Sequence, residues 1–146
     1  MAASKRANKR KYFTAAQANA MLPLLRAILR DVTQLAQELR DRHDRMQRLH
    51  SGAQSGLGTA HREEVEQMEA EFERGRERME AYLHELDGLG IELKDPFTGV
   101  VDFRCQIDGR EAYLCWRMDE PEVAHWHELD SGFAGRQKLR EKAASN

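Results

Sequence analysis

The sequence predicts an α+β fold, with a long, coiled-coil-like antiparallel hairpin of two helices followed by a small antiparallel β-sheet of about three strands. Apolar residues recur at steps of three and four through 22–50 and 65–89, which places them on one face of each helix. From Ile91 onward the apolar period shortens towards two, as in strands with one buried face. We expect four parts in chain order: a disordered basic tail (1–11), the helical hairpin (12–90), a small sheet packed on the hairpin base (91–136) and a polar tail (137–146).

The start of the helical region carries a capping signal. Thr14 is followed three residues later by Gln17, which is the spacing of a capping box. Pro23 falls inside the apolar pattern, so it either begins a second helix or kinks a single one. We favour a short helix over 14–21 that bends into a long one.

Two long helices are expected to pair. Three glycines within 51–58 separate them, and Thr59 is the expected cap of the second. Residues 24–50 carry six Arg and four acidic residues, whereas 59–89 carry four Arg and ten acidic residues, so their charges favour antiparallel pairing. Because two helices alone bury little surface, we expect the hairpin to pack on the sheet, on a second copy, or on both, and we predict a homodimer.

Asp108-Gly109 is the strongest turn signal in the chain. A two-residue turn there sets the register of the two strands around it, and the apolar residues then share one face. The predicted pairs are Ile107–Arg110, Cys105–Ala112, Phe103–Leu114 and Val101–Trp116, with Asp102–Cys115 and Arg104–Tyr113 on the opposite face.

A third strand is expected over 123–128, and two registers are open for it. With a five-residue connection (118–122), His125 lies opposite Cys115 and His127 lies opposite Tyr113. A four-residue connection reverses the parity, places Trp126 beside Cys115 and turns both histidines towards the apolar side. The residues alone do not decide between the two registers.

The densest group of reactive side chains lies around this third strand. In the first register, thiol, imidazole and carboxylate groups gather on one face, and this donor set suits zinc or another borderline divalent metal. The spacing matches no standard zinc motif, so hydrogen-bonded histidines at a strand end are the structural alternative. The candidate ligand or metal-site residues are Asp102, Cys115, His125, His127, Glu128 and Arg136.

Four of these residues also suggest acid–base chemistry. Asp102, His127, Glu128 and Arg136 could line a cleft between sheet and hairpin, where a buried carboxylate beside a histidine suits proton transfer. No nucleophile elbow, phosphate loop or paired catalytic motif accompanies them in the sequence. A structural ion-pair network, in which Arg136 pairs with Asp102 or Glu128, is the plainer interpretation.

Composition argues against some classes of function but does not identify the function itself. The net charge of −2 argues against nucleic acid as a partner, and no apolar run approaches the roughly 20 residues of a membrane span. Two cysteines without a secretory-type leader favour a reduced, cytoplasmic setting. Our first hypothesis is a non-catalytic protein-interaction or scaffolding module that uses the helical hairpin. The alternative is a metal- or small-ligand-binding protein, with or without enzymatic activity, whose site lies on the sheet.

Several short motifs resemble one family. They are Phe13-Thr14, Ala18-Asn19, Leu22-Pro23, Glu92-Leu93-Lys94-Asp95, Gly99 to Phe103, Gly109-Arg110, Leu114-Cys115-Trp116, Trp126-His127-Glu128 and Gly132-Phe133-Ala134-Gly135-Arg136. Together they resemble a bacterial family catalogued as domain-of-unknown-function family 2203, over roughly residues 12–138. The chain departs from the expected family pattern at Gln17, Cys105 and His125. The resemblance supports the expected boundaries and implies no activity.

Overall fold

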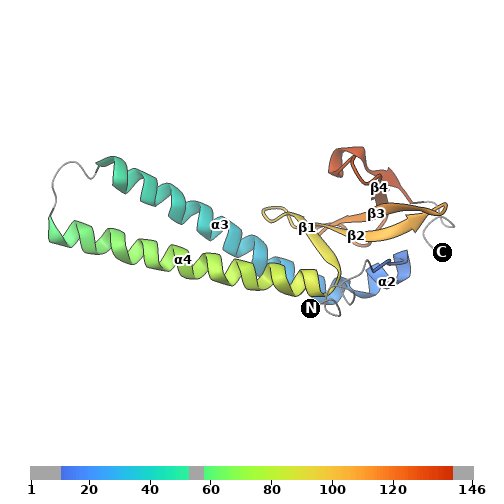
Figure 1. The fold of residues 1–146 in the computed structure, drawn as a ribbon, viewed down its shortest axis with the longest axis horizontal. Coiled ribbons are helices and arrows are strands. Elements are labelled where there is room, and N and C mark those ends of the chain that lie inside the picture. Colours follow the sequence, from blue (N-terminus) through green and yellow to red (C-terminus); the bar gives the residue numbers. More distant parts are fainter. Residues whose placement is uncertain (1–10, 53–57, 140–146) are drawn as a thin grey trace, which may run out of the picture.

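The computed structural model describes residues 11–52 and 58–139, which form a helical hairpin with a sheet at its base (Figure 1). Its elements, in chain order, are α2 (Ala15–Ala20), α3 (Leu22–Gly52), α4 (Thr59–Gly88), β1 (Ile91–Asp95), β2 (Val100–Ile107), β3 (Arg110–Arg117), β4 (His125–His127), the 3-10 helix η2 (Phe133–Gly135) and β5 (Gln137–Lys138). The predicted α+β class and the two long helices are confirmed. The expectations for most of both tails concern residues 1–10 and 140–146, which lie outside the described residues. Among the described residues, no helix combines the length and the apolar character that crossing a membrane requires.

The helices begin much as the sequence predicts. The Thr14 hydroxyl accepts the Gln17 N–H at 3.1 Å and the Gln17 side chain accepts the Thr14 N–H at 3.0 Å, so the predicted capping box is confirmed. A turn at Met21 joins α2 to α3, which confirms the short helix bending into a long one. At the second long helix the prediction is wrong by one residue, because Gly58 is the N-cap and Thr59 is already helical.

The sheet is an antiparallel meander in the order β1-β2-β3-β4-β5. The register of β2 and β3 confirms every predicted pair, including Asp102 opposite Cys115. Asp108 and Gly109 both have positive φ, as a tight two-residue hairpin turn requires. In β4, His125 lies opposite Cys115 and His127 opposite Tyr113, so the structure has the register expected for a five-residue connection.

The sheet has five strands, so the prediction of about three was too low. Strand β1 has five residues, and its pairing with β2 is irregular between Leu93 and Asp95. Few residues of β1 therefore follow the regular alternation that identifies a strand in a sequence. Strand β5 has two exposed residues and lies within the segment predicted as a polar tail. A period of two cannot be detected over two residues, so only the pairing of β5 with β4 defines it.

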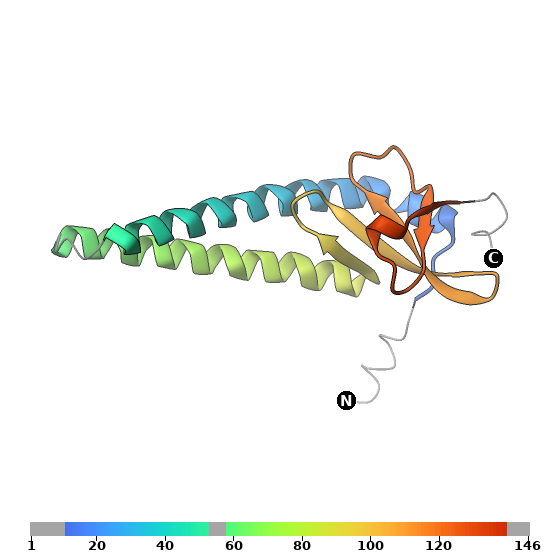
Figure 2. The same cartoon turned by 90° about the horizontal axis from the view of Figure 1, so that it is seen from above.

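Two layers cover the sheet, one on each face (Figures 1 and 2). Its inner face joins α2 and the hairpin base in one core, whose fully buried members include Leu25, Leu29, Phe103 and Trp116. The segment 128–136, drawn in red, crosses the opposite face, which we call the outer face. On this outer face Asp102, Cys115 and His127 are buried, whereas Gln106 near the end of β2 is exposed.

Burial along the hairpin decreases with distance from the sheet. Leu25, Leu29 and Val32 are fully buried, whereas the apolar side chains of the described seam beyond Leu39 are only partly buried. Gly75 lies opposite Leu39, and a Cβ on this glycine would come within 2.6 Å of Leu39 Cδ2. The missing side chain thus lets the two helices approach closely at the point where full burial ends.

Polar groups on the N-terminal helices hold the connection between β3 and β4. The Arg26 guanidinium donates to the carbonyls of Met118, Glu120 and Pro121 at 3.0–3.2 Å and lies over the Trp116 ring. Further along the same connection, the Asn19 side-chain oxygen accepts the Val123 N–H at 2.7 Å. These contacts fix the path of the connection, and hence which residues of β4 face outward.

We predict that Arg26→Met destabilises the protein by about 2 kcal/mol, because three carbonyls lose a charged donor while the apolar contact with Trp116 is largely kept. Urea unfolding followed by circular dichroism measures this loss. Arg30→Met, at an exposed position one turn further along α3, is the matched control and should change stability by less than about 0.5 kcal/mol. Equal effects of the two substitutions would show that the connection does not depend on Arg26.

Candidate functional site

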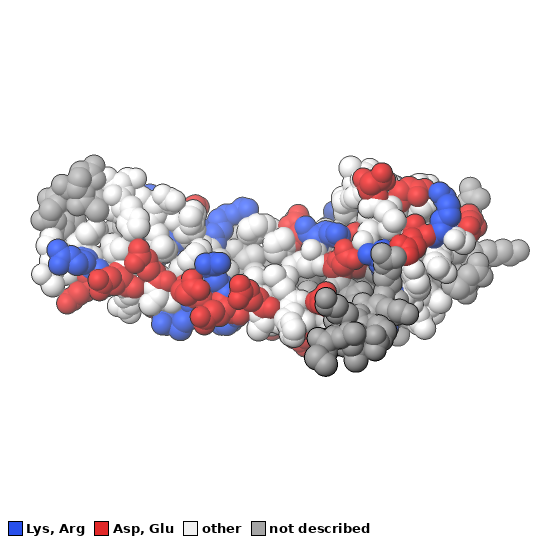
Figure 3. Space-filling model, in the orientation of Figure 1, with Lys and Arg blue, Asp and Glu red and all other residues white. Residues whose placement is uncertain are grey.

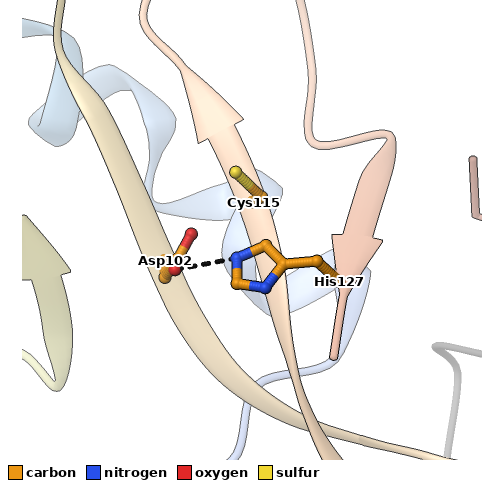
Figure 4. A group of neighbouring side chains, drawn as sticks. All are labelled: Asp102, Cys115 and His127. Atoms are coloured by element: carbon orange, nitrogen blue, oxygen red, sulfur yellow. Dashed lines mark hydrogen bonds and ion pairs between the residues drawn. The ribbon is translucent and has the colours of Figure 1, made fainter. Parts of the chain in front are cut away.

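Three of the six candidate residues form one buried cluster on the outer face. Asp102, Cys115 and His127 come from the adjacent strands β2, β3 and β4, and at most 2% of each residue is exposed. One ligand atom from each lies within 4.8 Å of the other two (Figure 4). Within the described ranges this is the one group of three or more His, Cys, Asp or Glu side chains close enough to share a metal ion.

The hydrogen bonds of His127 place one proton on Nδ1 and a second between Nε2 and Asp102. Its Nδ1 lies 2.7 Å from the Glu128 carbonyl oxygen, and since a carbonyl can only accept, Nδ1 carries a proton. Its Nε2 lies 2.9 Å from Asp102 Oδ2 (Figure 4). One further proton must lie between these two atoms, either on Nε2 as imidazolium facing carboxylate or on Oδ2 as carboxylic acid facing neutral imidazole. The cluster therefore contains a buried pair that shares a proton.

The charged form of Asp102 is only partly stabilised by its surroundings. Burial raises the pKa of its carboxyl group, and the His127 charge and hydrogen bonds from Cys115 and His127 oppose this effect only in part. Its second oxygen, Oδ1, is buried and has no well-formed hydrogen-bond partner among the described residues. The Cys115 thiol is close enough to interact with the carboxylate, but a thiol is a weak donor. A buried carboxylate oxygen in this position can accept a stronger donor or a cation.

Cys115 is a protonated thiol rather than an activated nucleophile. Burial, followed by the nearby Asp102 charge, raises the pKa of Cys115 to about 12. The imidazole of His127 is hydrogen-bonded to Asp102, so it does not serve as a base for the thiol. Nucleophilic cysteines need a depressed pKa and a nearby base. The chemistry left to Cys115 is coordination, in which a metal ion displaces the thiol proton.

A pocket of about 140 Å³ borders this cluster, between the sheet and the segment 128–136. Asp102 and His127 line it, together with the Lys94 side chain from β1. The Glu92 carboxylate, as hydrogen-bond acceptor, raises the pKa of Lys94, so its ammonium is charged at neutral pH. The remaining lining residues are Val100, Tyr113, Leu129, Gly132 and Phe133. The pocket is thus lined by apolar side chains, by the Lys94 ammonium, and by Asp102 and His127, which share a proton.

The other three candidate residues lie near the cluster but do not join it. His125 and Arg136 form a neighbouring network, in which Arg136 Nη2 donates to His125 Nδ1 at 2.7 Å and to both carboxylate oxygens of Glu120. Burial and the Arg136 charge lower the pKa of His125. The Glu128 carboxylate lies 3.6 Å from Arg110, so Glu128 reaches the site only through its carbonyl.

Two details of the expected acid–base site were wrong. The pocket is lined by residues of the sheet and by Leu129, Gly132 and Phe133 of the segment 128–136, and by no described residue of the hairpin, so it does not lie in a cleft between sheet and hairpin. Arg136 pairs with Glu120 rather than with Asp102 or Glu128, because Glu120 is brought to it by the connection that Arg26 holds. Lys94 and Phe133, which line the pocket, were not among the predicted site residues. The alternation of Ile91 and Leu93 with polar residues could have indicated Lys94, whereas Phe133 comes from a segment without regular spacing.

The raised pKa of Asp102 predicts a pH-dependent stability. The folded metal-free protein holds this carboxyl proton more tightly than the unfolded chain does. The contribution of Asp102 to the free energy of unfolding is therefore fully present at pH values below the ordinary pKa of 3.8. It is lost as the pH rises through the raised folded pKa. Relative to Asp102→Asn, the wild type should therefore be more stable at about pH 4 than at about pH 7.

Urea unfolding of both proteins at each pH measures this difference. Asp130→Asn, which replaces an exposed aspartate in the segment 128–136, corrects for the general loss of a carboxyl group. A stability difference that is constant with pH, or that grows in favour of the wild type as the pH rises, would contradict the raised pKa.

Comparison with known proteins supports the family resemblance. The sequence profile described as "Uncharacterized conserved protein (DUF2203)" matches residues 11–139, which include every described helix and strand. Comparisons with curated proteins and with solved structures find no match. Since the profile covers most of the 146 residues, the chain belongs to the DUF2203 family of uncharacterized conserved proteins.

Proposed function

We propose that this protein binds a divalent transition-metal ion, with zinc as the best fit, through Asp102, Cys115 and His127. The observation that carries the proposal is the buried cluster of three different donor atoms within 4.8 Å, one of which, Asp102 Oδ1, lacks a well-formed partner in the described chain. Carboxylate, thiolate and imidazole are the side-chain ligands of zinc in proteins. The sheet site is thereby better supported than the interaction module that was our first hypothesis.

The contacts around His127 also support a metal site. Metal-binding histidines commonly donate their second ring N–H to a carbonyl or carboxylate, which fixes the tautomer and turns the other nitrogen to the metal. In His127, Nδ1 donates to the Glu128 carbonyl, and Nε2 faces Asp102 and Cys115. The present 2.9 Å between Nε2 and Asp102 Oδ2 is shorter than the roughly 3.3 Å between two donors of a tetrahedral zinc ion. An ion would therefore replace the shared proton and move the two groups slightly apart.

Charge balance also favours a divalent ion. Asp102 and Cys115, once both are deprotonated, carry two negative charges, and His127 with its proton on Nδ1 is neutral when it coordinates. A divalent cation neutralises this set, so the buried site holds no net charge. Without an ion the thiol stays protonated because its pKa is about 12. Metal binding must therefore strengthen as the pH rises, since protons compete for the same atoms.

We predict that the full chain, purified without an affinity tag, binds about one Co²⁺ or Zn²⁺ per molecule and shows a thiolate-to-cobalt charge-transfer absorption. Cys115→Ala should abolish this absorption, because it removes the only thiol of the cluster. Cys105→Ala is the matched control, since Cys105 is equally buried but belongs to the inner core. Metal analysis and absorption spectroscopy provide the measurements. A wild type that takes up no ion, or a charge-transfer band that persists in Cys115→Ala, would remove the proposal.

We also propose that the part of the hairpin furthest from the sheet, which is α3 beyond Leu39 and α4 before Gly75, pairs with a second copy of the chain. In the described part of the seam beyond Leu39, the apolar side chains are only partly buried; they include Met46, Leu49, Val65, Met68 and Phe72. The two helices carry unequal charge, and acidic side chains line α4 on the face seen in Figure 3. A second copy that places its α3 against this α4 would cover the seam and match the charges.

This second proposal predicts a dimer at micromolar concentration by size exclusion with light scattering. Met68→Glu should shift the protein to monomer, because it places a charge in the half-buried seam. Ala70→Glu adds the same charge at an exposed position on the same helix and should leave the dimer intact. A wild-type protein that elutes with the mass of a single chain would refute the pairing.

A further inference from the structure

The three-donor cluster leaves one coordination position open. A tetrahedral zinc ion needs four ligands, and in the described ranges the group of close donors contains only Asp102, Cys115 and His127. Two other potential ligands on the same face of the sheet, Glu92 opposite Asp102 and His125 opposite Cys115, are paired elsewhere. His125 accepts an N–H from Arg136, and the Glu92 carboxylate is bound by Lys94 at 3.0 Å. Because the described residues offer no other side-chain donor this close, we take the fourth ligand to come from solution, as in metal centres that bind water or a substrate.

The pocket provides the place for such a ligand. Two of the three donors, Asp102 and His127, line it, and Asp102 Oδ1, the carboxylate oxygen without a well-formed partner among the described residues, belongs to one of them. Its volume of about 140 Å³ is well below the several hundred Å³ that drug-sized ligands require. The occupant is therefore a small molecule, larger than a single water and smaller than a nucleotide or a peptide.

The pocket lining indicates the chemistry of this small molecule. Val100, Leu129 and Phe133 offer an apolar wall, and Lys94 is the only cation among the lining residues. Glu92 occupies one of the three donor positions of the Lys94 ammonium, so further N–H groups remain for an anion. A carboxylate satisfies both requirements at one end, since it coordinates zinc through an oxygen and pairs with an ammonium.

We propose that the pocket binds a short-chain organic carboxylate, whose carboxylate group takes the coordination position left open by Asp102, Cys115 and His127 and pairs with Lys94. The alkyl part of the ligand lies against Val100, Leu129 and Phe133. This inference rests on the metal site proposed above. It makes the site an open centre that recognises a small acid, rather than a closed structural one.

The experiment uses the full chain loaded with Co²⁺, with propionate as the probe and propionamide as its uncharged counterpart. Propionate should change the cobalt d–d absorption in a saturable manner, and propionamide should not. Lys94→Met should weaken propionate binding roughly tenfold or more, which is the loss expected on removal of one partner of a charged hydrogen bond. Lys138→Met, which removes a lysine on β5 outside the pocket, should leave the affinity unchanged.

The outcomes separate the two proposals. If the thiolate-to-cobalt band forms but propionate does not alter the spectrum, the metal site stands and the carboxylate pocket is overturned. Equal responses to propionate and propionamide, or equal losses in Lys94→Met and Lys138→Met, also overturn it. If the thiolate-to-cobalt band does not form, the metal site fails and this inference fails with it.

Discussion

The connection between β3 and β4 is the constraint on which the outer face depends. A strand shows alternate residues to opposite faces, so one residue more or less in this connection would turn His127 into the core and Trp126 towards Asp102. Arg26 and Asn19, on the N-terminal helices, hold the connection from the far side of the sheet. The helices therefore supply the core of the sheet and also determine which side chains of β4 meet Asp102 and Cys115.

This dependence explains what the sequence could and could not predict. The Asp108-Gly109 turn is local, and from it the whole β2–β3 register follows, including Asp102 opposite Cys115. The parity of β4 is not local. It is set by hydrogen bonds between residues 92 to 104 positions apart, such as that from the Val123 N–H to Asn19, and no spacing rule reports them. Two of the three cluster residues, Asp102 and Cys115, were thus predicted as a pair, and the position of His127 was predicted only as one of two alternatives.

The failure to predict strand β5 and the wrong prediction of the Arg136 partner have related causes. Strand β5 exists only because it pairs with the edge of β4, so its two residues contain no pattern of their own. Glu120 lies in a connection that reads as an ordinary polar turn, yet its two carboxylate oxygens hold Arg136 against the outer face. Both features depend on tertiary contacts that override local preference. The two long helices, in contrast, were predicted from the sequence, since a long helix repeats its apolar spacing many times.

The polypeptide backbone orients the His127 ring and holds the proton on Nδ1, because Nδ1 donates to the Glu128 carbonyl and not to a side chain. Every amino acid supplies such a carbonyl. Position 128 can therefore change its side chain freely without altering which ring nitrogen faces Asp102, provided that the strand ends in the same conformation. The component of the site that orients the imidazole is in this sense robust to mutation, whereas Asp102 and Cys115 contribute through atoms that only their own side chains carry.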